Sequence, residues 1–312
     1  MTGTEIHPDA PPLLLVLGPT ASGKSALTHG AALRLGGEIL AVDSMTVYRG
    51  MDLGTAKPTP AERDEVRYHG LDLVDPSETF TVARWTEEAE RVIADTRSRG
   101  VPLLLCGGTP LYYQALLRGM FEGPPADEAF RASLRDVDDA ELHRRLGEVD
   151  PQAAARLHVN DRKRLLRALE VHALTGRTIS ELQTQWSQGP NRYETIRFGL
   201  AWERPELNRR INARSKQMIA CGWLDEVKDL LDRYGEFSST AREAAGYRLL
   251  ADHLRGRIKL DDAAEQIKIK TRQLAKRQMT WFRRFENTTW LRGGAGEANL
   301  DLVVQRWTEA AG

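Results

Sequence analysis

The chain has 312 residues, 41% of them hydrophobic and 28% charged, which is typical of a globular protein with an ample core. Its 44 basic and 44 acidic residues cancel, so only a local patch could attract a polyanion such as nucleic acid. No apolar run approaches the about 18 residues of a membrane span, and no signal peptide opens the chain, so we expect a cytoplasmic protein without a membrane partner.

The first predicted strand, residues 13–17, runs directly into a phosphate-binding pattern, Gly18-Pro19-Thr20-Ala21-Ser22-Gly23-Lys24-Ser25. The glycines permit a tight turn, and the N–H groups of the loop and of the next helix, residues 26–35, suit anionic oxygens. Lys24 adds a positive charge, and Ser25 can reach a Mg²⁺ held between phosphates. The motif predicts a diphosphate or polyphosphate site. It does not decide whether phosphate is the group transferred, a binding group of the substrate or the leaving group.

The next elements alternate between strand and helix. Strands are predicted at residues 38–42, 71–74 and 101–106, a long functional loop at 44–64 and a helix at 80–98. This order favours an α/β fold with a P-loop NTPase-like parallel sheet, in which ligands lie beyond the carboxyl ends of the strands. We therefore expect the phosphate loop, Asp43 and Thr109 to converge.

Asp43 and Thr109 are the candidate polar groups at these strand ends. Asp43 could hold Mg²⁺ through water, act as a general base or cap a loop. The strand before Gly107-Gly108-Thr109 ends in Cys106, whereas ATP-hydrolysing P-loop proteins commonly place an aspartate there for Mg²⁺. This difference argues against an ATPase and leaves a kinase open.

The second half of the chain predicts a change of architecture. Residues 119–195 read as an all-helical insertion, with helices over 127–136, 138–147, 151–157, 161–174 and 178–186. A strand at 196–202, long helices at 204–233 and 263–285, a strand at 289–291 and a helix at 299–310 follow. We expect residues 12–118 and 196–312 to form the α/β core, and residues 119–195 a helical insertion domain.

Two helices carry concentrated positive charge. Residues 266–284 hold seven basic residues and no acidic one. Helical spacing places Lys270 and Arg277 beside an apolar stripe expected to face the core, which comprises Ile267, Leu274, Trp281, Phe282 and Phe285. A second basic run is Arg162-Lys163-Arg164 with Arg167. Helices whose charged residues are all basic indicate a polyanionic partner. The alternative interpretation is that acidic groups elsewhere in the protein pair with this basic face.

The cysteines and histidines predict no metal centre. Cys106 and Cys221 lie far apart in apolar sequence, which is typical of a reducing compartment. The seven histidines show no zinc-binding spacing.

These motifs together resemble the tRNA dimethylallyltransferase family, also called the isopentenyl-tRNA or IPP transferases. The resemblance extends over residues 13–292. It rests on residues 18–25, Val42-Asp43-Ser44, residues 48–58, Gly107-Gly108-Thr109, Asn160-Asp161 with residues 164–170, and residues 271–278 with Thr280-Trp281.

The resemblance implies transfer of a dimethylallyl group from dimethylallyl diphosphate to N6 of the adenosine at tRNA position 37, with Mg²⁺ as cofactor. It implies that residues 20–25 hold the diphosphate, that Asp43 is the base, and that Thr109 and Arg248 lie at the catalytic centre. Glu243 stands where many relatives have Gln. The helical insertion would grip the anticodon stem-loop, and the residues implied in tRNA contact are Asp43, Ser44, Met45, Thr46, Thr109, Arg131, Lys163, Arg164, Leu165, Leu166 and Arg167.

Two other functions remain open from the residues alone. A P-loop kinase for a small metabolite or nucleoside would need the phosphate loop but not the basic helix at 266–284. A non-catalytic RNA-binding regulator would need that helix but no base at Asp43. We expect the protein to be a monomer.

Overall fold

The computed structural model describes residues 11–119, 123–183 and 191–311. The described chain forms two compact units, one of residues up to Leu116 together with those from Tyr193 onward, the other Leu117–Arg192. Among the described residues, no helix is long and apolar enough to cross a membrane.

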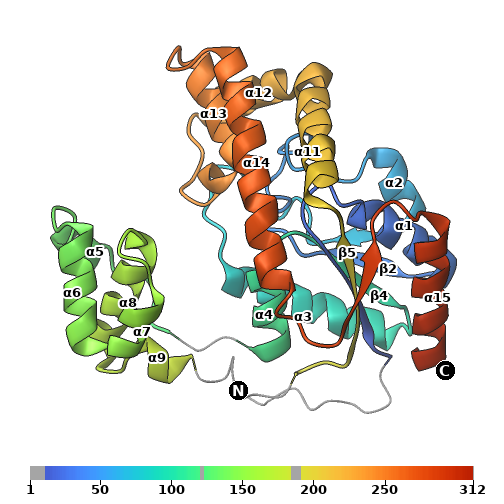
Figure 1. Cartoon of the computed structure of the whole chain (residues 1–312), viewed down its shortest axis with the longest axis horizontal. Coiled ribbons are helices and arrows are strands. Elements are labelled where there is room, and N and C mark those ends of the chain that lie inside the picture. Colours follow the sequence, from blue (N-terminus) through green and yellow to red (C-terminus); the bar gives the residue numbers. More distant parts are fainter. Residues whose placement is uncertain (1–10, 120–122, 184–190, 312) are drawn as a thin grey trace. The chain divides into compact units, whose positions relative to one another are not determined.

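The larger unit contains one parallel sheet with the strand order β3-β2-β4-β1-β5-β6 (Figure 1). In the central strand β1, Leu15 is in register with Leu105 on one side and with Arg197 on the other. All residues of β1 are buried, as expected for a strand covered on both faces. The α/β fold predicted from the sequence is confirmed. The strands are β1 Leu13–Leu17, β2 Glu38–Ala41, β3 Tyr68–His69, β4 Leu103–Cys106, β5 Thr195–Ala201 and β6 Thr288–Arg292.

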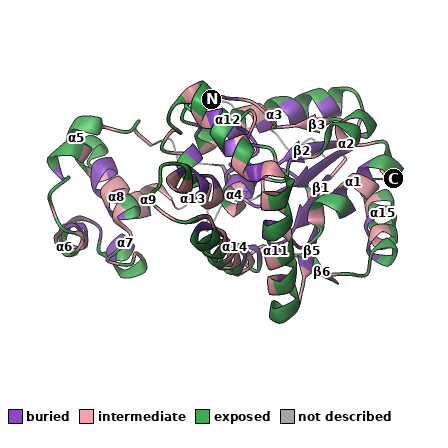
Figure 2. Ribbon diagram, turned by 90° about the horizontal axis from the view of Figure 1, so that it is seen from above, coloured by how far each residue is buried: buried purple, intermediate pink, exposed green. Residues whose placement is uncertain are grey.

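Helices cover both faces of this sheet. The helices α1 (Lys24–Leu35) and α15 (Glu297–Ala311) bury Leu27, Ala31 and Val303 against one face. The helices α3 (Val82–Ser98) and α4 (Pro110–Arg118) lie on the other, where Trp85 donates its indole N–H to the carbonyl of Ala41 at 3.1 Å. Figure 2 shows the strands buried between these helices. The short helix α2 (Pro60–Glu65) follows the loop after β2 and starts with a capping box.

A helical layer lies beyond the sheet within the same unit. It contains α11 (Arg204–Met218), α12 (Leu224–Tyr234), α13 (Ala245–Leu254) and α14 (Leu260–Phe282), and α14 packs against both α11 and α13 (Figure 1). Since α14 supplies residues to the pocket described below, this layer positions the site.

The described residues of the smaller unit form helices and connecting turns, without a strand among them. Leu142, Leu146 and Leu165 form its fully buried core. Aspartate or threonine side chains cap each helix N-terminus, which fixes where the helices begin. Its helices are α5 Glu128–Ser133, α6 Asp139–Val149, α7 Pro151–Arg156, α8 Arg162–Thr175 and α9 Ile179–Leu182, and the expected helical residues 184–186 lie outside the described residues.

Several local predictions are wrong. The expected strand at 71–74 is a single bridge between Val74 and Tyr48, because Gly70 and Asp72 take positive φ values of 75° and 54°. The helix expected over 204–233 is interrupted by a π-helical turn at Ile219–Trp223, where Gly222 has a φ of 99°. Helix α13 was not predicted. Cys221 is exposed, although an apolar setting was expected.

Candidate active site

The predicted diphosphate loop, residues 18–25, connects β1 to α1, and Gly18 and Gly23 must be glycine. A Cβ on Gly18 would lie 2.9 Å from the hydroxyl of Ser22, and Gly18 has a φ of 150°. Gly23 has a φ of 93° and precedes the first residue of α1, so the N–H groups of the helix N-terminus face the loop. The amine of Lys24 lies 3.4 Å from the carbonyl of Pro19. The sequence folds here into the strand, glycine-containing turn and helix that the motif predicts.

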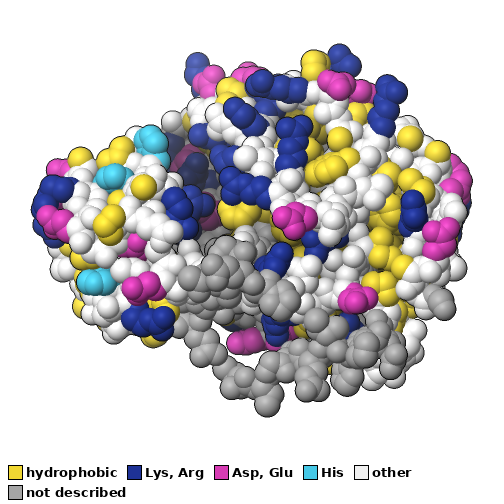
Figure 3. Space-filling view, turned by 60° about the horizontal axis from the view of Figure 1, so that its bottom comes forward, with side chains coloured by type: hydrophobic (Ala, Val, Ile, Leu, Met, Phe, Trp, Pro, Cys, Tyr) yellow, Lys and Arg dark blue, Asp and Glu magenta, His cyan; other side chains and the backbone are white. Residues whose placement is uncertain are grey.

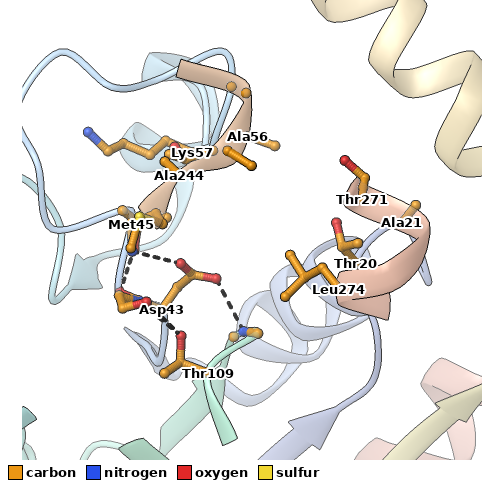
Figure 4. Close-up of a pocket in the computed structure, with 18 of the residues that line it drawn as sticks. Thr20, Ala21, Asp43, Met45, Ala56, Lys57, Thr109, Ala244, Thr271 and Leu274 are labelled. Carbon is orange, nitrogen blue, oxygen red and sulfur yellow. Dashed lines mark hydrogen bonds between the residues drawn. The ribbon is translucent and has the colours of Figure 1, made fainter. Parts of the chain in front are cut away.

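Asp43 lies directly beyond β2, and its carboxylate is held by backbone N–H groups. Its two oxygens accept hydrogen bonds from the N–H of Met45 at 2.9 Å and of Gly108 at 3.3 Å (Figure 4). The hydroxyl of Thr109 accepts from the N–H of Ser44 at 2.9 Å. The loops after β2 and β4 are therefore joined, and the carboxylate has a fixed orientation.

These loops open into one pocket of about 690 Å³ within the larger unit. Figure 4 shows Asp43, Met45 and Ala244 on one side and Thr20, Thr271 and Leu274 on the other. Among the described residues of its lining, seven side chains are basic and three acidic, so the pocket suits an anionic ligand. The charged residues are Lys24, Lys57, Arg214, Arg242, Arg248, Lys270 and Arg277, with Asp43, Glu62 and Glu243.

Two cations, Lys24 and Arg214, line the pocket together with Asp43 and are partly buried. Desolvation lowers the pKa of Lys24, and the negative charge of Asp43 opposes this shift. Desolvation likewise lowers the pKa of Arg214 on α11, again opposed by Asp43. An anionic ligand would offset the cost of keeping both groups charged. No sequence motif marks Arg214, which therefore escaped prediction.

The predicted loop residues divide into two groups. Thr20, Ala21, Lys24 and Ser25 line the pocket. The other four, Gly18, Pro19, Ser22 and Gly23, are not part of its lining and form the turn behind it.

The other predicted residues of the larger unit also lie at this pocket. Its lining includes Ser44, Met45, Thr46, Thr109, Arg248, Lys270 and Arg277. Leu274 is 40% exposed and lines the same pocket, so its expected place in the core is wrong, whereas Ile267 and Phe282 are buried as expected. Leu274 thus faces the pocket instead of the core, and Ile267 lines the pocket although it is buried.

The remaining predicted residues lie in the smaller unit. Arg131 and Arg167 both bind the buried carboxylate of Glu170, at 2.8 Å and 2.6 Å. Arg164 pairs with Asp161. Leu165 is completely buried, so its side chain is not on the surface.

The surface of the smaller unit carries both signs of charge. Figure 3 shows basic and acidic side chains next to one another at its edge, which agrees with the ion pairs of α6 between Arg144 and Glu141 and between Arg145 and Glu141. Lys163 and Leu166, both predicted to contact tRNA, belong to α8 in this unit.

Comparison with known proteins identifies the family. The family model for IPP transferase matches residues 46–285. The chain belongs to the IPP transferase family. It is 48% identical to a tRNA dimethylallyltransferase of Geobacter metallireducens over 89% of this chain and 92% of that protein.

Solved structures of family members have the same fold. A tRNA isopentenylpyrophosphate transferase from Bacillus halodurans is 36% identical, with a TM-score of 0.72 over 96% of both chains. A eukaryotic dimethylallyltransferase acting on tRNA is 26% identical, with a TM-score of 0.79 over 96% of this chain and 78% of that one. The IPP transferases are prenyltransferases, so membership favours prenyl transfer over the kinase and regulator alternatives.

The donor set at the loop fits a metal held mainly by a substrate. No group of three or more His, Cys, Asp or Glu side chains that could hold a metal occurs in the described ranges. The hydroxyl of Ser25 and the carboxylate of Asp43 both line the pocket. Mg²⁺ is commonly bound by one or two protein oxygens together with phosphate oxygens and water, and these two residues can supply that share.

Proposed function

We propose that this protein transfers a dimethylallyl group from dimethylallyl diphosphate to N6 of the adenosine at tRNA position 37, beside the anticodon, and releases diphosphate. The observation that carries the proposal is that Asp43 and the diphosphate loop open into one pocket whose charged lining residues are mainly cations. One end of this pocket suits the leaving group and the other suits the nucleophile.

The diphosphate end stabilises the leaving group. As the allylic C–O bond breaks, negative charge develops on the diphosphate oxygens, and pre-oriented cations at that position lower the barrier. Lys24 and Arg214 are such cations, and the N–H groups at the start of α1 add to their field. Bound Mg²⁺ would add Lewis-acid stabilisation of the same charge, with Ser25 among its ligands.

Asp43 serves the nucleophile. The exocyclic amine of adenine is a weak nucleophile because its lone pair is delocalised into the ring, and its N–H becomes acidic as the new C–N bond forms. A carboxylate fixed at that amine can take the proton. The hydrogen bonds from Met45 and Gly108 hold Asp43 in a single orientation, which favours proton transfer in a fixed geometry.

The RNA is held by basic helices on both units. Lys270 and Arg277 of α14 lie at the pocket and suit the phosphates flanking an unstacked base. The proposed helical insertion domain, residues 119–195, would contact the anticodon stem-loop through Arg131, Lys163, Arg164 and Arg167. Leu165 could do so only through its backbone. We propose that the enzyme acts as a monomer in the cytoplasm.

The test is a comparison of donors. Wild type and Lys24→Ala are incubated with tRNA and either labelled dimethylallyl diphosphate or labelled ATP. The proposal expects label on tRNA from dimethylallyl diphosphate only, with transfer by Lys24→Ala reduced chiefly through weaker donor binding while tRNA affinity stays nearly intact. Transfer of labelled phosphate from ATP would favour the kinase alternative.

A further inference from the structure

A buried glutamine links the two ends of the pocket. Gln278 lies on α14 and is 5% exposed. Its side-chain carbonyl accepts a hydrogen bond from the N–H of Thr20 at 2.8 Å, and its amide N–H donates to the carbonyl of Gly108 at 2.7 Å. Both partners are backbone groups, one in the diphosphate loop and one in the loop after β4.

Gly108, the second of these partners, is also hydrogen-bonded to Asp43. The N–H of Gly108 donates to the carboxylate of Asp43 at 3.3 Å. Three successive hydrogen bonds therefore connect Thr20 with Asp43. A Cβ on Gly108 would lie 2.5 Å from the amide nitrogen of Gln278 and 3.1 Å from the carboxylate of Asp43. Only glycine therefore fits at this position between the two side chains.

The chemistry of this position suits an amide. A buried polar side chain has to satisfy its donors and acceptors, and an amide supplies one of each to two different backbone groups. An ionised carboxylate at this place would turn an oxygen toward the carbonyl of Gly108, and an apolar side chain would leave the Thr20 N–H without this acceptor. The basic residues Lys276 and Arg277 next to it in sequence are exposed.

We propose that Gln278 is a positioning residue that sets the spacing between the diphosphate loop and the carboxylate of Asp43. Gln278 lines the same pocket, and it acts through the two loops that its side chain joins. This inference rests on the proposed function, because the experiment below measures transfer of the dimethylallyl group. Its physical basis is that a shift of about 1 Å between catalytic groups can cost about 10² in rate.

Two variants of this residue separate positioning from simple loss of fold. Gln278→Met keeps the length of the side chain and removes both hydrogen bonds. Gln278→Glu keeps an acceptor for Thr20, and it regains a donor to Gly108 only when the introduced carboxyl group is protonated. Burial and the nearby charge of Asp43 raise the pKa of such a group. The ratio of variant to wild-type kcat for Gln278→Glu should therefore rise as the pH falls.

The experiment measures kcat and the KM for tRNA of wild type and both variants between pH 5.5 and 8.5, with thermal unfolding as a check on folding. The matched control is Gln266→Glu, the same change at an exposed position of α14 outside the pocket. We expect kcat of Gln278→Met to fall by about 10- to 100-fold with the tRNA KM within threefold. The control should match wild type at every pH.

The outcomes distinguish the two proposals. If wild type modifies tRNA while both Gln278 variants keep kcat within threefold at every pH, positioning by Gln278 is overturned and the proposed function stands. A pH-independent ratio for Gln278→Glu, or an effect on tRNA KM alone, also overturns it. If wild type itself transfers no dimethylallyl group, the proposed function fails, and the inference fails with it.

Discussion

Two hydrogen bonds of 2.7 and 2.8 Å join the guanidinium of Arg99 to the carboxylate of Glu38, where β2 begins. His69 lies 2.7 Å from the same carboxylate. The Arg99 hydrogen bonds, against the opposing effect of burial and with help from His69, lower the pKa of Glu38 from 4.5 to about 2. This cluster ties β2 to the segment after α3 at the amino end of the sheet.

Glu38 should make the free energy of unfolding of the larger unit depend on pH in the acidic range. Because its folded pKa is depressed, its contribution is present above the unfolded pKa of 4.5 and is lost as the pH falls toward 2. We expect Glu38→Gln to lower the free energy of unfolding by up to about 3 kcal/mol at pH 7, with a gap to wild type that narrows below pH ~4.5. Denaturant unfolding from pH 7 to pH 3 measures this, with Glu87→Gln as the exposed control. A gap that stays constant with pH would contradict the account.

Gly54, in the loop that follows β2, must be glycine for Trp223 to pack against this loop. A Cβ there would lie 2.2 Å from the indole of Trp223, which is 4% exposed and meets the ring of Tyr247 edge to face. We expect Gly54→Ala to cost about 1–3 kcal/mol of unfolding free energy through overpacking. The control is Gly30→Ala on α1, where the nearest atom is the flexible end of Leu300 at 3.1 Å. Equal stability of the two variants would show that the indole can move aside.

Asp43 should affect turnover and leave RNA binding nearly intact. We expect Asp43→Asn to lower single-turnover transfer by about 10² or more, the usual effect of a general base, with tRNA affinity within a few-fold of wild type. The amide keeps the size of the carboxylate, and an oxygen that can accept from Met45 remains, so the loop should stay in place. Asp64→Asn, an exposed change on α2, is the control. Turnover of Asp43→Asn within threefold of wild type would remove Asp43 from the mechanism.

Binding of tRNA should weaken steeply with salt, because each neutralised phosphate releases counterions. Substitution of Lys163, Arg167, Lys270 or Arg277 by Gln should each flatten the slope of log K against log salt by up to about one unit. Lys228→Gln, on an exposed face of α12, should leave it unchanged. Titrations at several salt concentrations measure this, and a flat wild-type response would contradict the proposed RNA contacts. Free adenosine should also react poorly, because it lacks the remote contacts that supply binding energy.

The sequence predicted the parts of the site that obey local rules. The α/β fold, the diphosphate loop and the loops around Asp43 and Thr109 follow from apolar strands that each end in glycine or polar residues. The order of such strands in a parallel sheet determines which loops meet, so the convergence of these loops could be expected.

The parts that were missed depend on the tertiary arrangement. Helical periodicity identifies the apolar stripe of α14, but it cannot tell a pocket wall from the core, and Leu274 faces the pocket. Arg214 lies on a helix with no recognisable motif. Gln278 stands among basic residues and looks like a surface residue, and its two partners are far away in sequence.

The identity of the modified nucleoside tests the central claim most directly. Wild type is incubated with unmodified tRNA and dimethylallyl diphosphate. One portion of the RNA is then digested to nucleosides and another to oligonucleotides, and both are analysed by mass spectrometry. The account predicts one new nucleoside, N6-dimethylallyladenosine, that maps to the position beside the anticodon and is absent with Asp43→Asn. A product in which phosphate is transferred, or tRNA that remains unmodified while the enzyme is folded and binds it, would contradict the account.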